Sequence, residues 1–153
     1  MPAEGMVHAL ELVHSLLLPQ GILVDIHPTG QPYAIEISVG GESRQLGVLQ
    51  ETDNYIEYFQ TDEALEKVMQ SGLFARTRHE NFIFLDHAAS LDELRSYLLD
   101  NWSDAVWPED VTSKAEEIAA SARPAEIPAT LREFVSISRL RRLAAGLDGY
   151  PSR

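Results

Sequence analysis

The sequence has no cysteine among its 153 residues, and this absence removes a whole group of chemistries. Disulfide bonds, thiolate metal sites and a cysteine nucleophile are all excluded. A chain without disulfides suits a reducing compartment, so we expect a cytoplasmic protein. The length is that of one ordinary domain, which can bury a core without cross-links.

Long hydrophobic runs are also missing. No stretch approaches the roughly 18 apolar residues that a membrane span needs. The apolar segment 1–18 is interrupted by Glu4, His8, Glu11 and His14 and has no basic start, which is unlike a signal peptide. We therefore expect no membrane association.

Positive charge is scarce, because 12 Lys and Arg residues face 24 Asp and Glu residues, for a net charge of −12. Residues 1–125 carry a net −14 and residues 126–153 a net +2. An acidic body repels phosphate backbones, so we expect no nucleic-acid partner. The one basic cluster, Arg139, Arg141 and Arg142, is better explained as a solvated helix face or a contact with the acidic body.

The common catalytic and ligand motifs are absent too. There is no Gly-x-Ser-x-Gly elbow and no glycine-rich phosphate loop. His8 and His14 are six residues apart and fall on different faces of a helix, while the adjacent Asp86 and His87 point to opposite sides of a strand. The sequence therefore predicts no metal site and no cofactor site.

The first half of the chain alternates helix and strand patterns. Apolar residues at helical spacing predict a helix over 5–18, which Pro19 ends, with Gly21 as a left-handed cap. The pattern then predicts a buried strand over 22–27, a β-hairpin over 33–50, and a helix from Thr61 or Asp62 to Gln70. Residues 73–88 form either a hairpin or one bent strand, of which the hairpin is preferred.

The sequence pattern of the second half predicts mainly helices. Ser90 and Glu93 form a capping box for a helix that ends near Trp102. Further helices are predicted from Asp110 or Thr112 to about Ser121, and over 129–145 after a linker bracketed by Pro124 and Pro128. We interpret Trp102 and Trp107 as packing residues, and divide the chain into an α/β domain over 1–105 and a helical C-terminal extension over 106–153.

Asp25 and His27 are the best-placed polar pair. They lie near the end of the strand predicted over 22–27, and strand alternation puts both side chains on the same face. Ligands of open α/β sheets bind beyond the carboxyl ends of strands, so the pair is a weak catalytic candidate. Hydrogen bonding to the following loop is the simpler interpretation, and it is favoured.

The segment "VHALELVHSLLLPQG" followed by "ILVDIHP" resembles the second half of class I S-adenosylmethionine-dependent methyltransferases. In that family a helix often ends in Leu-x-Pro-Gly-Gly and a strand of the form Leu-x-x-x-Asp follows. The residues that occupy these places are Leu18, Pro19, Gln20, Gly21 and Leu23 to Asp25, with Gln20 in place of the first glycine. The resemblance extends over about residues 6–88, and the hairpin over 33–50 looks like an insertion.

The cofactor-binding half of that family is not present. Only 20 residues precede Gly21, whereas each βα unit needs about 30. The resemblance therefore implies a truncated Rossmann-like mixed sheet, of class α/β or α+β, without cofactor-binding residues. The strand over 22–27 would then expose an edge that either the hairpin over 33–50 or a second chain must cover.

Two classes of function follow. The first is a non-catalytic methyltransferase-like remnant that acts as a ligand- or protein-interaction module and forms a homodimer. The second is an enzyme, which is either a methyltransferase subunit completed by a partner chain carrying the cofactor-binding half, or an activity that uses Asp25 and His27. The absence of catalytic motifs favours the first.

Overall fold

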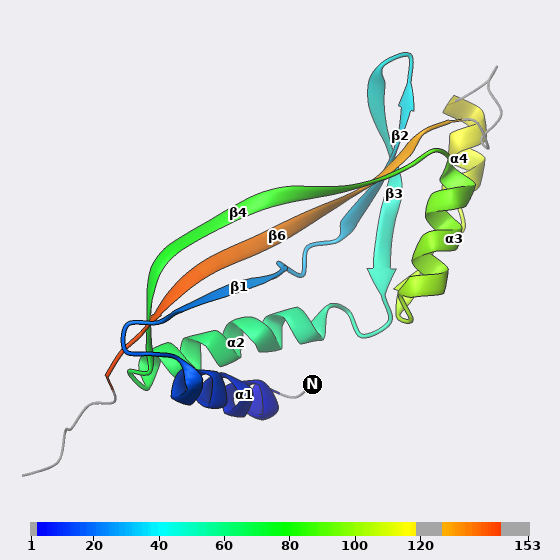
Figure 1. The fold of residues 1–153 in the computed structure, drawn as a ribbon. Helices are drawn as coiled ribbons and strands as arrows, with labels where there is room; N and C mark the ends of the chain where they lie inside the picture. The colour runs from blue at the N-terminus through cyan, green and yellow to red at the C-terminus, as the bar shows by residue number, and fades with distance from the viewer. Residues whose placement is uncertain (1–2, 119–126, 145–153) are drawn as a thin grey trace, which may run out of the picture. The chain divides into compact units, whose positions relative to one another are not determined.

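The computed structural model describes residues 3–118 and 127–144, which form four helices and six strands (Figure 1). No helix in these two ranges is both long and apolar enough to cross a bilayer. The elements, in chain order, are α1 (Ala3–Leu16), β1 (Ile22–Pro28), β2 (Tyr33–Val39), β3 (Glu42–Glu51), α2 (Ile56–Gln70), β4 (Phe74–Ala88), α3 (Leu91–Asn101), β5 (Ala105–Val106), α4 (Val111–Ile118) and β6 (Ala129–Arg142).

The six strands form one open antiparallel sheet in the order β1-β6-β2-β3-β5, with β4 paired to β6. In the β2–β3 hairpin Tyr33 lies opposite Leu49, and the register shifts between Ile35 and Glu36. β2 also pairs with the start of β6, where Ala34 lies opposite Arg132. The fold is therefore α+β, one of the two classes predicted from the sequence. The parallel pairing that is typical of a Rossmann-like sheet is not found among the described strand pairs.

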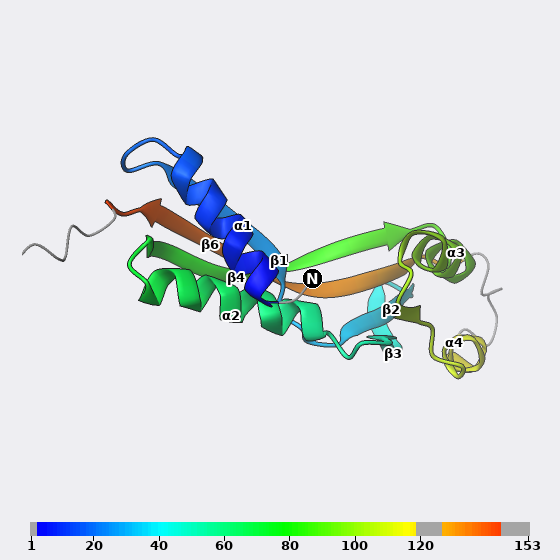
Figure 2. The ribbon, with the colours of Figure 1, turned by 90° about the horizontal axis from the view of Figure 1, so that it is seen from below.

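The chain divides into two compact units, and β4 and β6 each contribute to both. Unit 1 comprises Met1–Thr29, Ile56–Phe82 and Ser136–Arg153. In unit 1, α1 and α2 lie on one side of its strands (Figures 1 and 2). The core between them contains Leu65, Val68, Phe74 and Leu140, with Val7, Leu10, Leu17, Leu23, Met69 and Leu73 packed against it.

Unit 2 comprises Gly30–Tyr55 and Ile83–Val135. Tyr33 is fully buried and packs against two aromatic rings, Tyr55 at a centroid distance of 5.6 Å and Trp102 at 5.1 Å. The Tyr55 hydroxyl donates a 2.7 Å hydrogen bond to the carbonyl of Leu49. Trp102 is therefore a packing residue, as the sequence predicts.

The predicted helix over 129–145 is wrong, because this segment is the strand β6. Apolar residues at Leu131, Val135 and Leu140 imitate helical spacing. The buried positions are odd-numbered from 129 to 135 and even-numbered from 136 to 140, so the strand alternation changes phase in mid-strand. Ser136 and Ser138 are buried although they are polar, which further hides the pattern.

The structure answers in part what covers the strand over 22–27. One edge of β1 pairs with β6 rather than with the hairpin over 33–50, and the other edge has no partner among the described strands. Of the two alternatives for residues 73–88, the preferred hairpin is wrong and the single strand is confirmed, because β4 is one strand of 15 residues. The compact units do not follow the boundary expected at residue 105, and α4 is the only helix that the described residues contain after that boundary.

Several other predictions concern element ends. The hairpin over 33–50 is confirmed as β2 and β3, and the helix expected from Thr61 begins earlier, at Ile56. The capping box is confirmed, since Ser90 Oγ accepts a 3.1 Å hydrogen bond from the Glu93 amide. The predicted helix end near Ser121 and the linker residue Pro124 lie outside the described residues.

The corner after α1 differs from the expectation in one detail. Gln20, rather than Gly21, has the left-handed conformation, with φ of 63°. Gly21 is required for a different reason, because a Cβ atom there would lie 2.8 Å from the carbonyl oxygen of Leu18. The Gly21 amide donates a 2.7 Å hydrogen bond to that same oxygen, which closes the corner.

Candidate functional site

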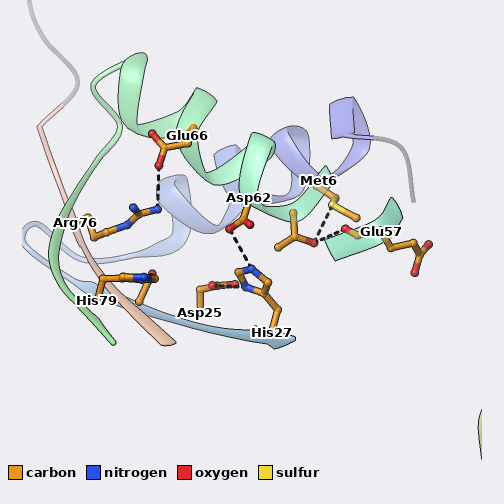
Figure 3. Close-up of polar contacts among 10 residues, drawn as sticks. Met6, Asp25, His27, Glu57, Asp62, Glu66, Arg76 and His79 are labelled. Carbon is orange, nitrogen blue, oxygen red and sulfur yellow. Dashed lines mark hydrogen bonds and ion pairs between the residues drawn. The ribbon is translucent and has the colours of Figure 1, made fainter. Parts of the chain in front are cut away.

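Asp25 and His27 lie together on the covered face of unit 1, as strand alternation predicts. His27 Nδ1 is 2.7 Å from Asp25 Oδ2, and His27 Nε2 is 3.2 Å from Asp62 Oδ1 on α2 (Figure 3). His27 is buried, Asp25 is nearly so, and the Asp62 side chain is 55% exposed. The sequence suggests Asp62 only as a possible helix start and not as a partner of His27, because nothing in the sequence places a residue 35 positions away beside it.

The two carboxylates favour the charged form of His27. Burial by itself lowers the pKa of His27, but the hydrogen bond and charge of Asp25, followed by those of Asp62, outweigh burial and raise it. A protonated imidazole donates from both nitrogens, one toward each carboxylate. No lone pair then remains for proton abstraction or metal binding, so the geometry supports a clamp between β1 and α2.

The other histidines each have a separate partner. His14 Nε2 is 3.0 Å from the carbonyl of Leu143, and its ring packs edge-on against Phe74. His79 contacts Ser138 at 3.0 Å and His87 contacts Thr130 at 3.1 Å. Within the part of the chain that the structure describes, no three His, Asp or Glu residues are grouped so that they could hold a metal ion.

An acidic pair in unit 2 has the most perturbed ionisation. Burial, followed by the charge and hydrogen bond of Asp86 and the charge of Glu51, raises the pKa of Glu133 from 4.5 to about 7. Asp86 also lines a small hollow of about 180 Å³ with Tyr97 and Trp102. Sequence analysis missed Glu133 because it assigned this segment to a helix. A group with such a pKa marks a candidate site only when other groups converge on it, and the groups that act on Glu133 are the carboxylates of Asp86 and Glu51.

The arginines of the basic cluster lie on a strand rather than on the expected helix. Arg142 Nη1 donates a 2.5 Å hydrogen bond to the carbonyl of Leu17, which anchors the end of β6 to the end of α1. Arg141 and Arg142 line an open hollow of about 500 Å³ together with Pro19 and Gln20. Arg142 therefore has a structural role.

One face of β1 is apolar and uncovered. Ile22, Val24 and Ile26 alternate with the residues that face the helices, and they are 37%, 53% and 59% exposed. A shallow hollow of about 320 Å³ on this side is lined by Val24, Ile137, Arg78, Glu80 and Arg139. Unit 1 thus has helices on one side of its strands and exposed β-branched residues on the other.

The most exposed strand is β4. Ten successive residues, 76 to 85, are exposed, which is unusual because alternate residues of a strand point to opposite faces. They include four consecutive large apolar side chains, Phe82, Ile83, Phe84 and Leu85, which are 41–48% exposed. β4 pairs only with β6 among the described strands, so its other edge carries unpaired backbone groups.

Natural proteins usually protect such an edge. Lysine, proline, a bulge or a covering loop prevents edge-to-edge association. The run from Phe82 to Leu85 contains no charge and no proline. β4 is therefore the strongest candidate interaction surface among the described residues.

Comparison with known proteins assigns neither a family nor a fold neighbour to the chain. No protein-family model, no curated protein and no solved structure matches the chain. The functional conclusion depends on the geometry alone.

Proposed function

We propose that the chain is a non-catalytic protein-interaction module that associates with a second copy of itself along β4. The observation that carries this proposal is the unpaired edge of β4 together with its exposed run from Phe82 to Leu85. A second copy that adds its own β4 would pair the free backbone groups of both edges. The six-stranded sheets would then join into one continuous sheet.

The energetics favour such pairing. Covering a half-exposed large apolar side chain stabilises a complex by about 1 kcal/mol, and each copy supplies four of them on this strand. The backbone hydrogen bonds add to this gain. Association costs at least about 4 kcal/mol of lost translational and rotational freedom, so the sum supports a dimer of moderate affinity.

Light scattering over a series of protein concentrations tests the proposal. The expected molar mass rises toward twice the chain mass of 17.1 kDa. The variant Phe84→Asp places a charge in the run and is expected to remain monomeric. The matched control is Phe59→Asp, because this phenylalanine is 55% exposed and belongs to α2 rather than to β4; this variant should associate like the original chain.

A monomer at every concentration would refute the proposal, and so would equal loss of association in both variants. The enzymatic alternative draws no support from the described geometry. Both ring nitrogens of His27 are engaged by carboxylates. A methyltransferase subunit would offer a parallel sheet to its partner, whereas the strand pairs described here are antiparallel.

A further inference from the structure

We propose that the hollow beside the end of β6 binds a small organic phosphate monoester through Arg141 and Arg142. This proposal goes beyond self-association along β4 and does not depend on it. The hollow has a volume of about 500 Å³ and is lined by Pro19, Gln20, Arg141, Arg142, Leu143 and Ala144. All of these residues belong to unit 1, so the site is formed within one compact unit.

The hollow is positively charged although the chain is acidic. The net charge of the chain is −12, yet no Asp or Glu is found among the described residues that line the hollow. Within the described ranges, neither Arg141 nor Arg142 has a carboxylate at ion-pair distance, whereas acidic partners are found for four other arginines, Arg44, Arg76, Arg78 and Arg132. Two guanidinium groups without a counter-ion favour an anionic ligand.

Arg142 also has a hydrogen-bond donor that is not satisfied. Its Nη1 donates a 2.5 Å hydrogen bond to the carbonyl of Leu17, but its Nε is buried and has no hydrogen-bond partner among the described residues. A buried donor without an acceptor destabilises a structure. Because Arg142 lines the hollow, an oxygen of an anion bound there can supply the missing acceptor.

The carbonyl oxygens at this corner are already engaged. They follow the C-terminal end of α1, where the helix dipole disfavours an anion. The Leu17 oxygen accepts from the Arg142 side chain, and the Leu18 oxygen accepts from the Gly21 amide. The Gly21 oxygen in turn accepts a 2.8 Å hydrogen bond from the Arg142 amide. These hydrogen bonds reduce the repulsion between the oxygens and an anion, so the charges of the two arginines dominate.

The size and lining of the hollow indicate the class of ligand. Its volume lies in the range of about 300–1,000 Å³ that is typical of sites for small organic molecules. Pro19, Leu143 and Ala144 offer apolar contacts to the organic group. A phosphate monoester carries a charge of about −1.5 to −2 at pH 7, which matches two guanidinium groups better than the single charge of a carboxylate or a sulfate ester.

Isothermal titration calorimetry with phenyl phosphate at about pH 7.5, where the ester is mainly a dianion, tests the proposal. Phenyl sulfate has the same ring with a single charge, and inorganic phosphate has the charge without the ring. We expect saturable binding of phenyl phosphate, with a Kd at least about tenfold lower than that of either comparison ligand. A short phosphoserine peptide distinguishes a small ligand from a modified protein.

Two arginine variants locate the binding. Arg141→Gln should keep the fold, because this exposed side chain makes no hydrogen bond or ion pair with the described residues, and should raise the Kd of phenyl phosphate at least about tenfold. The matched control is Arg139→Gln, which removes the same charge from the same strand but lines the other hollow, with Val24. Its Kd should change by less than about twofold, since solvent screens the more distant charge.

Each outcome supports or overturns the proposal. Saturable binding of phenyl phosphate that Arg141→Gln weakens and Arg139→Gln does not would support it. Equal weakening by both variants would show only a general attraction of anions and would overturn the site, as would the lack of saturable binding. Equal affinity for phenyl sulfate would overturn the preference for a dianion, and equal affinity for inorganic phosphate would indicate an adventitious ion only. Tighter binding of the peptide would overturn the assignment to a small ligand.

Discussion

At the residue scale, the pair singled out from the sequence turns out to be half of a three-residue clamp. Period-two alternation was enough to place Asp25 and His27 on one face, and their 2.7 Å contact confirms it. The third member, Asp62, comes from α2 and could be found only from the fold. Its addition changes the interpretation of His27 from a candidate base to a residue whose two ring nitrogens link strand and helix.

Substitution of Asp25 tests the clamp. Asp25→Asn removes a hydrogen bond to a charged, buried group, so we expect the free energy of unfolding at pH 6 to fall by about 1.5–3 kcal/mol. Asp62→Asn is the matched control. It should lower the free energy of unfolding by less than about 1 kcal/mol, since that carboxylate is 55% exposed. Urea unfolding followed by far-ultraviolet circular dichroism measures both; equal losses would contradict a clamp centred on Asp25.

The clamp also has a defined pH dependence. Because the pKa of His27 is raised above 6.5, its contribution to stability is complete below pH 6.5 and is lost as pH rises through the higher value. The variant His27→Gln should therefore lose the most stability relative to the original chain at low pH. The difference in the free energy of unfolding between the two chains should narrow as pH rises through the raised pKa of His27.

The corner after α1 provides a second prediction at this scale. Gly21→Ala forces a Cβ atom to within 2.8 Å of the Leu18 carbonyl oxygen and should destabilise the fold by about 1–3 kcal/mol. Gln20→Gly should stabilise it by up to about 1 kcal/mol, since glycine adopts the left-handed conformation without steric cost. Thermal unfolding of the two variants measures both stability changes. A Gly21→Ala variant as stable as the original chain would show that the corner can relax.

At the element scale, the first three helices and the hairpin could be predicted, β4 could be predicted as strand but not as one continuous strand, and β6 could not be predicted. The capping box of Ser90 and Glu93 predicts the start of α3 from local sequence. Strand alternation and a glycine turn predict β2 and β3. β6 changes its buried parity in mid-strand, so no single period describes it. β4 is exposed on both faces, so it has no amphipathic pattern to recognise.

The carboxyl pair that joins β4 to β6 makes a prediction for these two strands. Since the pKa of Glu133 is raised from 4.5 to about 7, the folded state binds a proton that the unfolded state has lost. Stability should therefore fall as pH rises from about 4.5 to about 7. The variant Glu133→Gln should lose most of this pH dependence of stability, and the exposed control Glu109→Gln should keep it. Urea unfolding between pH 5 and 8 measures the free energy of unfolding of both variants.

At the scale of the whole molecule, the net charge of −12 opposes any association between two copies. This repulsion acts over the whole surface and is strongest at low ionic strength. We therefore expect dimerisation to tighten as salt rises from about 20 mM to about 300 mM, where the Debye length falls below about 10 Å. Sedimentation equilibrium at several salt concentrations measures this, and tighter binding at low salt would indicate an interface dominated by ion pairs.

The central claim is that a second copy covers the free edge of β4, and amide hydrogen exchange observes that edge directly. Exchange of the β4 backbone amides is compared between a dilute and a concentrated sample, with the α2 amides as an internal reference. The account predicts that the outward-facing amides around Phe82 exchange slowly in the concentrated sample and quickly in the dilute one, while α2 does not change. Fast exchange of these amides at both concentrations would show that the edge stays open and would contradict the account.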